Sequence, residues 1–211
     1  MKHAFRVIWL SLRGTYEELF VLAAANLLAL LLCLPIVTAP PALAGLHNLA
    51  FYVVTEKRVE LRLFWEGFKE FALDSWKLTA INALVFGILG MDVWFYLSNV
   101  RGVWRVLGFV GVWMLAIWAV AQLYALPLLV RQEERKLLPL IKNTVLLTLA
   151  FPVFSVTVVL SLLLLLALSL LLPILFVLVG PVFAAVTGAH ALRWGIESVE
   201  AHRAAQDDDH T

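Results

Sequence analysis

The sequence predicts an all-α polytopic membrane protein, with six transmembrane helices arranged as three hairpins and one amphipathic helix on the cytoplasmic side. Three observations predict this fold class. Hydrophobic residues make up 63% of the 211 residues and charged residues 15%, whereas soluble domains contain about 45–50% apolar and about 25% charged residues. Several apolar runs are long enough to cross a membrane. The longest run, 143–189, contains no acidic, basic or histidine residue.

The predicted spans follow from the lengths of these runs. A helix needs about 20 residues to cross about 30 Å of hydrocarbon. The last run would form one helix of about 70 Å at about 1.5 Å per residue, so it must fold back. We expect its turn at Ser169 to Pro173, because proline lacks a backbone donor and interrupts helices. The runs are, in order, 19–37, 41–54, 78–97, 103–130 and 143–189.

The second run is short for a span, and two interpretations of it stay open. Continued to Arg58, it covers about 27 Å at about 1.5 Å per residue, with Lys57 and Arg58 reaching out to the interface. The alternative is a re-entrant hairpin around residues 35–41. The fourth run, 103–130, is longer than a bilayer needs, so it must tilt or extend into the cytoplasm.

The positive charges predict the orientation of the spans. With six spans and a cytoplasmic N-terminus, only Arg101 and Arg105 of the sixteen Lys and Arg residues fall outside. Cytoplasmic loops are enriched in Lys and Arg, so we expect both termini in the cytoplasm. The expected outer aromatic belt is Trp94, Phe95, Tyr96 and Trp104, and the inner belt is Trp9, Trp65, Trp76 and Trp194.

The segment 61–76 has the pattern of an amphipathic helix on the inner surface, with apolar residues on one side. Its polar face mixes both signs of charge, whereas a lipid-seeking helix is rich in Lys and Arg because the inner leaflet is anionic. Two interpretations stay open, a solvated collar helix and a docking face for a protein partner. The face comprises Arg62, Glu66, Lys69, Glu70 and Asp74.

The chain reads as one transmembrane domain, 1–206, followed by an acidic tail, 207–211, that we expect to be disordered. Small residues in the last span, Gly180, Ala184 and Gly188, recur every fourth position and allow close helix approach. They predict either an internal packing seam or a homodimer contact.

Polar side chains within the predicted spans are the candidates for function, because polar groups are costly at membrane depth. Asp92 is the one acidic residue among them; it is expected either to pair with Arg101 or Arg105 or to form a solute or proton site. The two histidines fall at different depths, so we expect no shared metal site. The candidates are Asn26, His47, Asn48, Asn82, Asp92, Gln122 and His190.

Several classes of function are disfavoured by composition and motifs. The single cysteine, Cys33, permits neither an internal disulfide nor a paired-cysteine metal site. A net charge of +1 provides no excess of basic residues that would indicate nucleic-acid binding. No zinc-protease, nucleophile-elbow or phosphate-loop motif occurs. We therefore expect no enzyme, no cofactor and no metal.

The string NLLALLLCLPIVTAPPALAG, residues 26–45, resembles the opening of the YesL family of bacterial integral membrane proteins, a domain of unknown function. The resemblance continues in FWEGFKEF, residues 64–71. It implies a bacterial plasma membrane and a link with carbohydrate uptake, with a sugar ABC transporter as a partner, and it carries over no catalytic residue. The matching features are Asn26, Leu34, Pro35, Thr38, Pro41 and Ala42; Thr38 is expected to cap the free amides between the two helices.

These observations predict a non-enzymatic accessory or regulatory membrane protein linked to carbohydrate uptake. The alternative is a small-solute transporter or channel with a polar site inside the membrane. A polar cavity that reaches Asp92 or His47 would favour the alternative, whereas a solid apolar interior would count against it.

Overall fold

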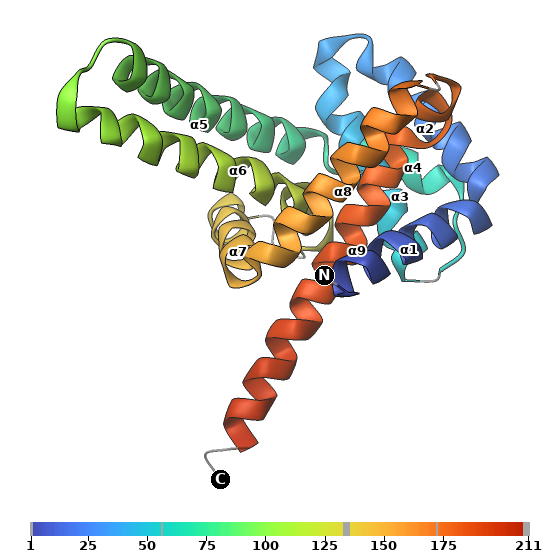
Figure 1. The fold of residues 1–211 in the computed structure, drawn as a ribbon. Coiled ribbons are helices and arrows are strands. Elements are labelled where there is room, and N and C mark those ends of the chain that lie inside the picture. Colours follow the sequence, from blue (N-terminus) through green and yellow to red (C-terminus); the bar gives the residue numbers. More distant parts are fainter. Residues whose placement is uncertain (1, 56, 133–135, 172, 209–211) are drawn as a thin grey trace.

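The computed structural model describes residues 2–55, 57–132, 136–171 and 173–208, and this part of the chain is helical, without a strand (Figure 1). The predicted all-α class is confirmed. The α-helices are α1 (Lys2–Glu17), α2 (Leu19–Cys33), α3 (Ala39–Val54), α4 (Leu61–Glu70), α5 (Ala72–Ser98), α6 (Val106–Arg131), α7 (Leu137–Ala150), α8 (Pro152–Leu171) and α9 (Pro173–Asp208), and the short 3-10 helices are η1 (Ile36–Thr38) and η2 (Gly102–Arg105).

Several of these helices are long and apolar enough to cross a membrane. Within the described residues, four segments meet this requirement alone, and the number rises to six if the bent pairs α1–α2 and α7–α8 each form one span. The pairs bend by 94° and 97° respectively. Six spans in three hairpins therefore stay a prediction. The four segments are Ile36–Val54, Ala72–Ser98, Gly102–Arg131 and Val177–Ala201.

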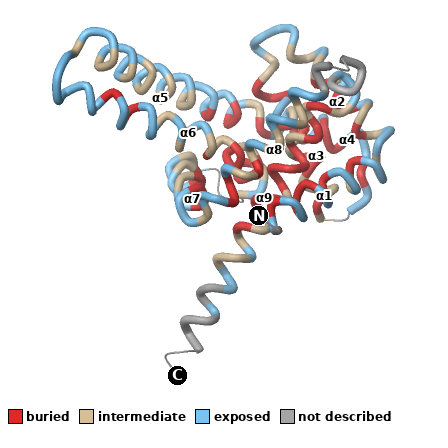
Figure 2. Tube along the Cα trace, in the orientation of Figure 1, coloured by how far each residue is buried: buried red, intermediate tan, exposed pale blue. Residues whose placement is uncertain are grey.

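The molecule consists of a packed body and a projecting arm. The arm is the antiparallel hairpin of α5 and α6. It projects away from the other helices and runs crosswise to α9 (Figure 1). Burial is concentrated in the body and at the root of α6, and the arm is mostly exposed (Figure 2). Only 6% of the apolar window of α5 is buried, against 56% for α9. The surface of the arm is therefore left for lipid or for another protein.

A proline in α9 explains why α2 packs against it. Pro181 has no amide hydrogen, so it cannot bond to the carbonyl of Val177 four residues earlier. The fully buried Asn26 of α2 supplies the missing bond, because its Nδ2 donates to the Val177 carbonyl at 2.6 Å. Its Oδ1 accepts from the Val182 amide at 3.0 Å. Asn26 thus completes the backbone of α9 and is a structural residue.

The close contact of α3 with α4 depends on two glycines. A Cβ on Gly45 would lie 2.7 Å from the backbone oxygen of Phe64, and a Cβ on Gly67 would collide with the Cβ of Asn48. Asn48 also donates from Nδ2 to the Leu63 carbonyl at 2.7 Å. The predicted amphipathic helix therefore packs its apolar face on α3. It ends at Glu70, and the next residues begin α5, so the predicted single helix 61–76 is wrong in its second half.

One hydrogen bond corrects the predicted topology. The indole Nε1 of Trp76, in the first turns of α5, donates to the carbonyl of Val37 between α2 and α3 at 2.8 Å. With a cytoplasmic N-terminus, the predicted span 19–37 ends outside at Val37, whereas Trp76 belongs to the predicted inner belt. The two residues would then lie on opposite sides of about 30 Å of hydrocarbon. Both assignments cannot hold. The physical reason is that α4 crosses α3 and brings the root of α5 beside the α2–α3 turn.

Three further predictions can be compared with the helix boundaries. The turn expected at Ser169 to Pro173 is confirmed in outline, since α8 ends at Leu171 and α9 begins at Pro173; residue 172 lies outside the described residues. The same long run is also interrupted earlier, where α8 begins at Pro152. Helix α9 continues to Asp208, so it includes the first two residues of the predicted tail, and 209–211 lie outside the described residues.

Gly188, one of the three small residues singled out in α9, packs closely on α6, and the choice between an internal seam and a homodimer contact for the three together stays a prediction. A Cβ on Gly188 would lie 3.0 Å from the Leu123 carbonyl oxygen and 3.1 Å from Cγ of Pro127, both in α6. Gly180 is buried and Ala184 is half-buried. Thr38 departs from its prediction. The carbonyls of Leu32 and Pro35 both lie within reach of its hydroxyl and share the single hydrogen that it donates, so Thr38 caps the end of α2 and not the start of α3.

Candidate functional site

The polar candidates from the sequence fall into three groups. Asn26 and Asn48 hold helices together, as described above. Asn82, Asp92 and Gln122 lie on the arm. His47 and His190 line two adjoining cavities in the body. The structure therefore does not gather the seven candidates into one site.

On the arm, the register of the two helices places Asn82 level with Gln122. Gly108 packs on Leu97 and Gly111 on Val93, which sets this register. Gln122 donates to the carbonyl of Trp118 at 3.1 Å. The Oδ1 of Asn82 is buried and has no hydrogen-bond partner within the described ranges.

Asp92 is exposed on the far half of α5. Neither cavity is lined by it. The pairing predicted with Arg101 or Arg105 is not among the ion pairs found in the described residues. Asp92 thus stands apart from the polar region of the body.

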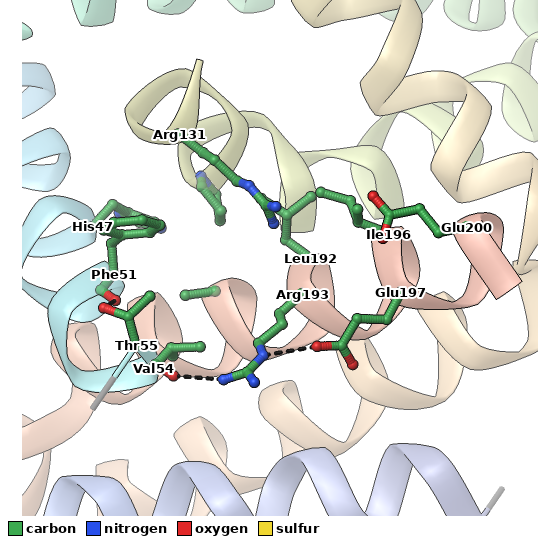
Figure 3. A pocket seen from close by; sticks show the side chains of 12 residues that line it. His47, Phe51, Val54, Thr55, Arg131, Leu192, Arg193, Ile196, Glu197 and Glu200 are labelled. Atoms are coloured by element: carbon green, nitrogen blue, oxygen red, sulfur yellow. Dashed lines mark hydrogen bonds and ion pairs between the residues drawn. The ribbon is translucent and has the colours of Figure 1, made fainter. Parts of the chain in front are cut away.

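The first cavity is a cleft of about 310 Å³ where the C-terminal ends of α3 and α6 meet α9 (Figure 3). It lies beside the contact of Gly188 with Pro127. Pro127 leaves the Leu123 carbonyl without its helical donor, and the glycine lets the backbones approach there. The lining residues are His47, Phe51, Val54, Thr55, Pro127, Arg131, Ala189, Leu192, Arg193, Ile196, Glu197 and Glu200.

Arg193 connects α9 to the end of α3. Its Nη1 donates to the Val54 carbonyl at 2.9 Å, and its Nε donates to Oε1 of Glu197 at 2.9 Å (Figure 3). The carbonyls in the last turn of a helix lack backbone donors, and a cation there also interacts favourably with the helix dipole. Arg193 therefore caps α3 while its charge remains at the cleft.

His47 presents one ring nitrogen to the cleft. Its Nδ1 lies 2.9 Å from the Leu43 carbonyl, one turn earlier in α3. A carbonyl only accepts, so Nδ1 carries the hydrogen, and in the neutral ring Nε2 is left as an acceptor. The ring points into the cleft, and on the opposite side the Arg131 side chain extends from α6 toward Leu192 (Figure 3). The cleft thus offers cations, an acceptor nitrogen and the carboxylates of Glu197 and Glu200.

The second cavity, of about 640 Å³, lies between α1, the C-terminal end of α3 and the middle of α9. Val54, Arg193 and Glu197 line both cavities, so the Arg193–Glu197 pair stands between them. The remaining lining residues of the second cavity are His3, Arg6, Val7, Leu10, Arg13, Gly14, Glu17, Glu18, Val53, Lys57, Val59, His190 and Trp194.

The charged and polar side chains that line the two cavities suit reversible binding of a polar or charged group.

Other kinds of site were also sought. No cluster of His, Cys, Asp or Glu able to hold a metal occurs in the described part of the chain. The Thr55 hydroxyl donates to its own helix, to the Phe51 carbonyl at 2.9 Å. The close hydroxyl pair Tyr124 and Ser155, at 2.7 Å, is buried in the core and joins α6 to α8.

The predicted docking face of α4 divides into exposed and buried parts. Arg62 and Glu66 are exposed and pair with each other at 3.0 Å, and Lys69 and Glu70 are also exposed. Asp74 belongs to α5, where it is buried and pairs with Lys77 at 2.9 Å. Asp74 is therefore not available on this face.

Sequence reasoning missed Arg131, Arg193 and Glu197 as site residues, since it used the arginines only to orient the spans. One signal was available: Arg193 and Glu197 are four residues apart at the charged end of an apolar helix. Their position beside His47 depends on the contact between α3 and α9, which no local pattern predicts.

Searches against models of known protein families, curated proteins and solved structures found no match. The resemblance to the YesL family therefore stays a prediction.

Proposed function

We propose that this chain is a non-enzymatic accessory or regulatory protein of the bacterial plasma membrane, linked to carbohydrate uptake, with a sugar ABC transporter as its partner. The link to carbohydrate uptake comes from the resemblance of residues 26–45 to the YesL family. The observation that carries the docking role is the polar face of α4, which is exposed while the opposite face is held tightly on α3.

The rigidity of α4 supports this proposal. Gly45, Gly67 and Asn48 bring the backbones of α3 and α4 together, so the exposed side chains stand on a fixed platform. A preorganised surface loses less conformational entropy when it binds a partner. Arg62, Glu66 and Lys69 provide both signs of charge, which suits specific pairing with a protein.

The test is co-purification from native membranes followed by mass spectrometry. The variant carries Glu66→Ala, Lys69→Ala and Glu70→Ala together, and its matched control carries Arg101→Ala and Arg105→Ala at the tip of the arm. We expect transporter subunits with the wild type and the control, and their loss with the α4 variant. An unchanged set of partners in all three preparations contradicts the proposal.

For orientation, we propose that the end carrying the two cavities faces the cytoplasm. Arg6, Lys57, Arg131 and Arg193 line these cavities, and cytoplasmic segments are rich in such residues. The N-terminus and the free half of α9 lie at this end (Figure 1). Val37 is exposed and lies beyond the end of α3 that is opposite the cavities. In a Cys33→Ser background, a membrane-impermeant thiol reagent added to intact cells should label Val37→Cys but spare Ala204→Cys. The reverse pattern contradicts this orientation.

A second candidate function is small-solute transport, and one specific observation favours it: the cleft reaches His47. The cleft also holds charges of both signs, which suits a zwitterionic or hydroxylated solute. Proteoliposome flux of candidate solutes should fall at least tenfold with His47→Leu, because the acceptor nitrogen is removed from the cleft. Asp92→Asn on the arm is the matched control and should leave flux unchanged. Equal flux in all three proteins excludes a transport role for this cleft.

A further inference from the structure

Helix α1 carries an apolar stripe that the rest of the chain does not cover. Its members recur at intervals of three or four residues, which places them on one side of a helix with about 3.6 residues per turn. Trp and Tyr are the residues enriched at membrane interfaces. The stripe consists of Phe5, Trp9, Leu12 and Tyr16, with exposed fractions of 74%, 61%, 46% and 79%.

A different side of α1 packs against α8 and α9. That side contains Ala4, Val7 and Ser11, all nearly or fully buried. The helix is therefore anchored to the body, and the stripe is an additional apolar surface. Contiguous exposed patches of this kind mark interaction sites with membranes or proteins.

The direction of α1 fits a helix lying in the membrane surface. The axis turns by 94° between α1 and α2. Since α2 has no charged residue, it belongs in hydrocarbon, and α1 then runs along the interface. The second cavity opens on the side of α1 that carries His3, Leu10 and Gly14, roughly opposite the stripe. With the stripe in lipid, this cavity faces water.

The charge of α1 selects the kind of surface it contacts. The one acidic residue of α1 is its last, Glu17, whose Oε1 accepts from Nε of Arg13 at 2.8 Å. Arg6 and Arg13, two turns apart, lie between the stripe and the cavity, and both line the cavity together with Lys57. Basic residues beside an apolar stripe match the anionic phosphates and acyl chains of one leaflet. The mixed charges of α4 lack this bias.

We propose that α1 is an interfacial helix that binds anionic phospholipid. Phe5, Trp9 and Tyr16 enter the boundary between headgroups and acyl chains. The guanidinium group of Arg6 donates hydrogen bonds to the lipid phosphate, and the phosphate competes with Glu17 for the guanidinium group of Arg13. The inference requires membrane insertion of α2, and it is independent of the partner and of the solute proposed above.

The first test measures binding of fluorescent phosphatidylglycerol to the full chain in mixed micelles, with the same label on phosphatidylcholine for comparison. Arg6→Gln with Arg13→Gln should weaken phosphatidylglycerol binding about 25-fold, at about fivefold for each arginine. The matched control, Arg101→Gln with Arg105→Gln, should bind as the wild type does. Equal loss in both variants, or displacement of the lipid by inorganic phosphate, overturns the assignment to phospholipid.

A second test uses two leucines of α1 and does not depend on the arginine variants. Leu12 lies on the stripe and Leu10 on the cavity side, with exposed fractions of 46% and 37%. A nitroxide attached to Leu12→Cys, in a Cys33→Ser background in phosphatidylglycerol-containing nanodiscs, should be accessible to oxygen and shielded from a water-soluble nickel chelate. A nitroxide at Leu10→Cys should show the opposite. Equal nickel accessibility at both sites places the stripe in water and overturns the proposal.

Discussion

Replacing Asn26 tests the connection between the proline in α9 and the helix that supports it. The substitution Asn26→Leu keeps the side-chain volume similar but removes both hydrogen bonds to α9, at 2.6 and 3.0 Å. The Val177 carbonyl then has neither the proline amide nor the asparagine. We expect a substantial loss of stability with little change in overall helix content.

The size of the effect follows from the two bonds. Interhelical hydrogen bonds in membrane proteins average about 0.6 kcal/mol and reach about 1.7 kcal/mol, whereas a buried backbone group left unpaired costs about 1–3 kcal/mol. Asn26 is fully buried, and Pro181 leaves one of its partners without an alternative donor. The expected loss is therefore about 2–3 kcal/mol.

A double-mutant cycle isolates the cause. Pro181→Ala restores an amide that can bond to the Val177 carbonyl, so Asn26→Leu should cost about 1 kcal/mol less in that background. The assay is reversible unfolding in detergent micelles, followed by circular dichroism. A cost below about 0.5 kcal/mol for Asn26→Leu, or the same cost in both backgrounds, refutes the reasoning.

Three further predictions concern packing and topology. Gly67→Ala should destabilise the protein by about 1–3 kcal/mol through overpacking. Its control is Gly87→Ala, whose new methyl group meets nothing within 4 Å and which should be neutral or slightly stabilising. Equal thermal unfolding of the two variants contradicts the tight α3–α4 contact. Tyr124→Phe should lower the free energy of unfolding by about 1 kcal/mol, because the Ser155 hydroxyl keeps its bond to the Phe151 carbonyl but loses the one to the phenol. Unchanged chemical denaturation shows that this buried hydrogen bond does not stabilise the protein. A short thiol cross-linker should join Val37→Cys to Trp76→Cys in a Cys33→Ser background but not Val37→Cys to Val54→Cys, and the opposite yields contradict the contact between the α2–α3 turn and the root of α5.

Run length predicted the long helices well. The expected spans 78–97 and 103–130 lie within Ala72–Ser98 and Gly102–Arg131, because uninterrupted apolar runs of this length have few alternatives to a helix. Pro173 marked the start of α9 for the same local reason. Such features depend on neighbouring residues alone.

Helix α1 and the contact of Val37 with Trp76 escaped the sequence analysis. The apolar residues of α1 lie on two sides, one that packs on the body and one that is exposed, so the sequence shows no single apolar stripe that would predict the helix. The position of Trp76 depends on whether the apolar face of α4 meets lipid or α3, and hydropathy does not distinguish these surroundings. Gly45 and Gly67 were the available signal, since each lies where two backbones approach.

The partnership of Asn26 with α9 also has a consequence for biogenesis. Asn26 and Val177 are separated by 151 positions, so α2 leaves the ribosome long before the helix that it completes. Until then its amide has no native acceptor, and an unpaired amide is costly in hydrocarbon. Nascent chains arrested before α9 should therefore be retained by the insertion machinery or degraded, and final assembly of the bundle should wait for the last helix.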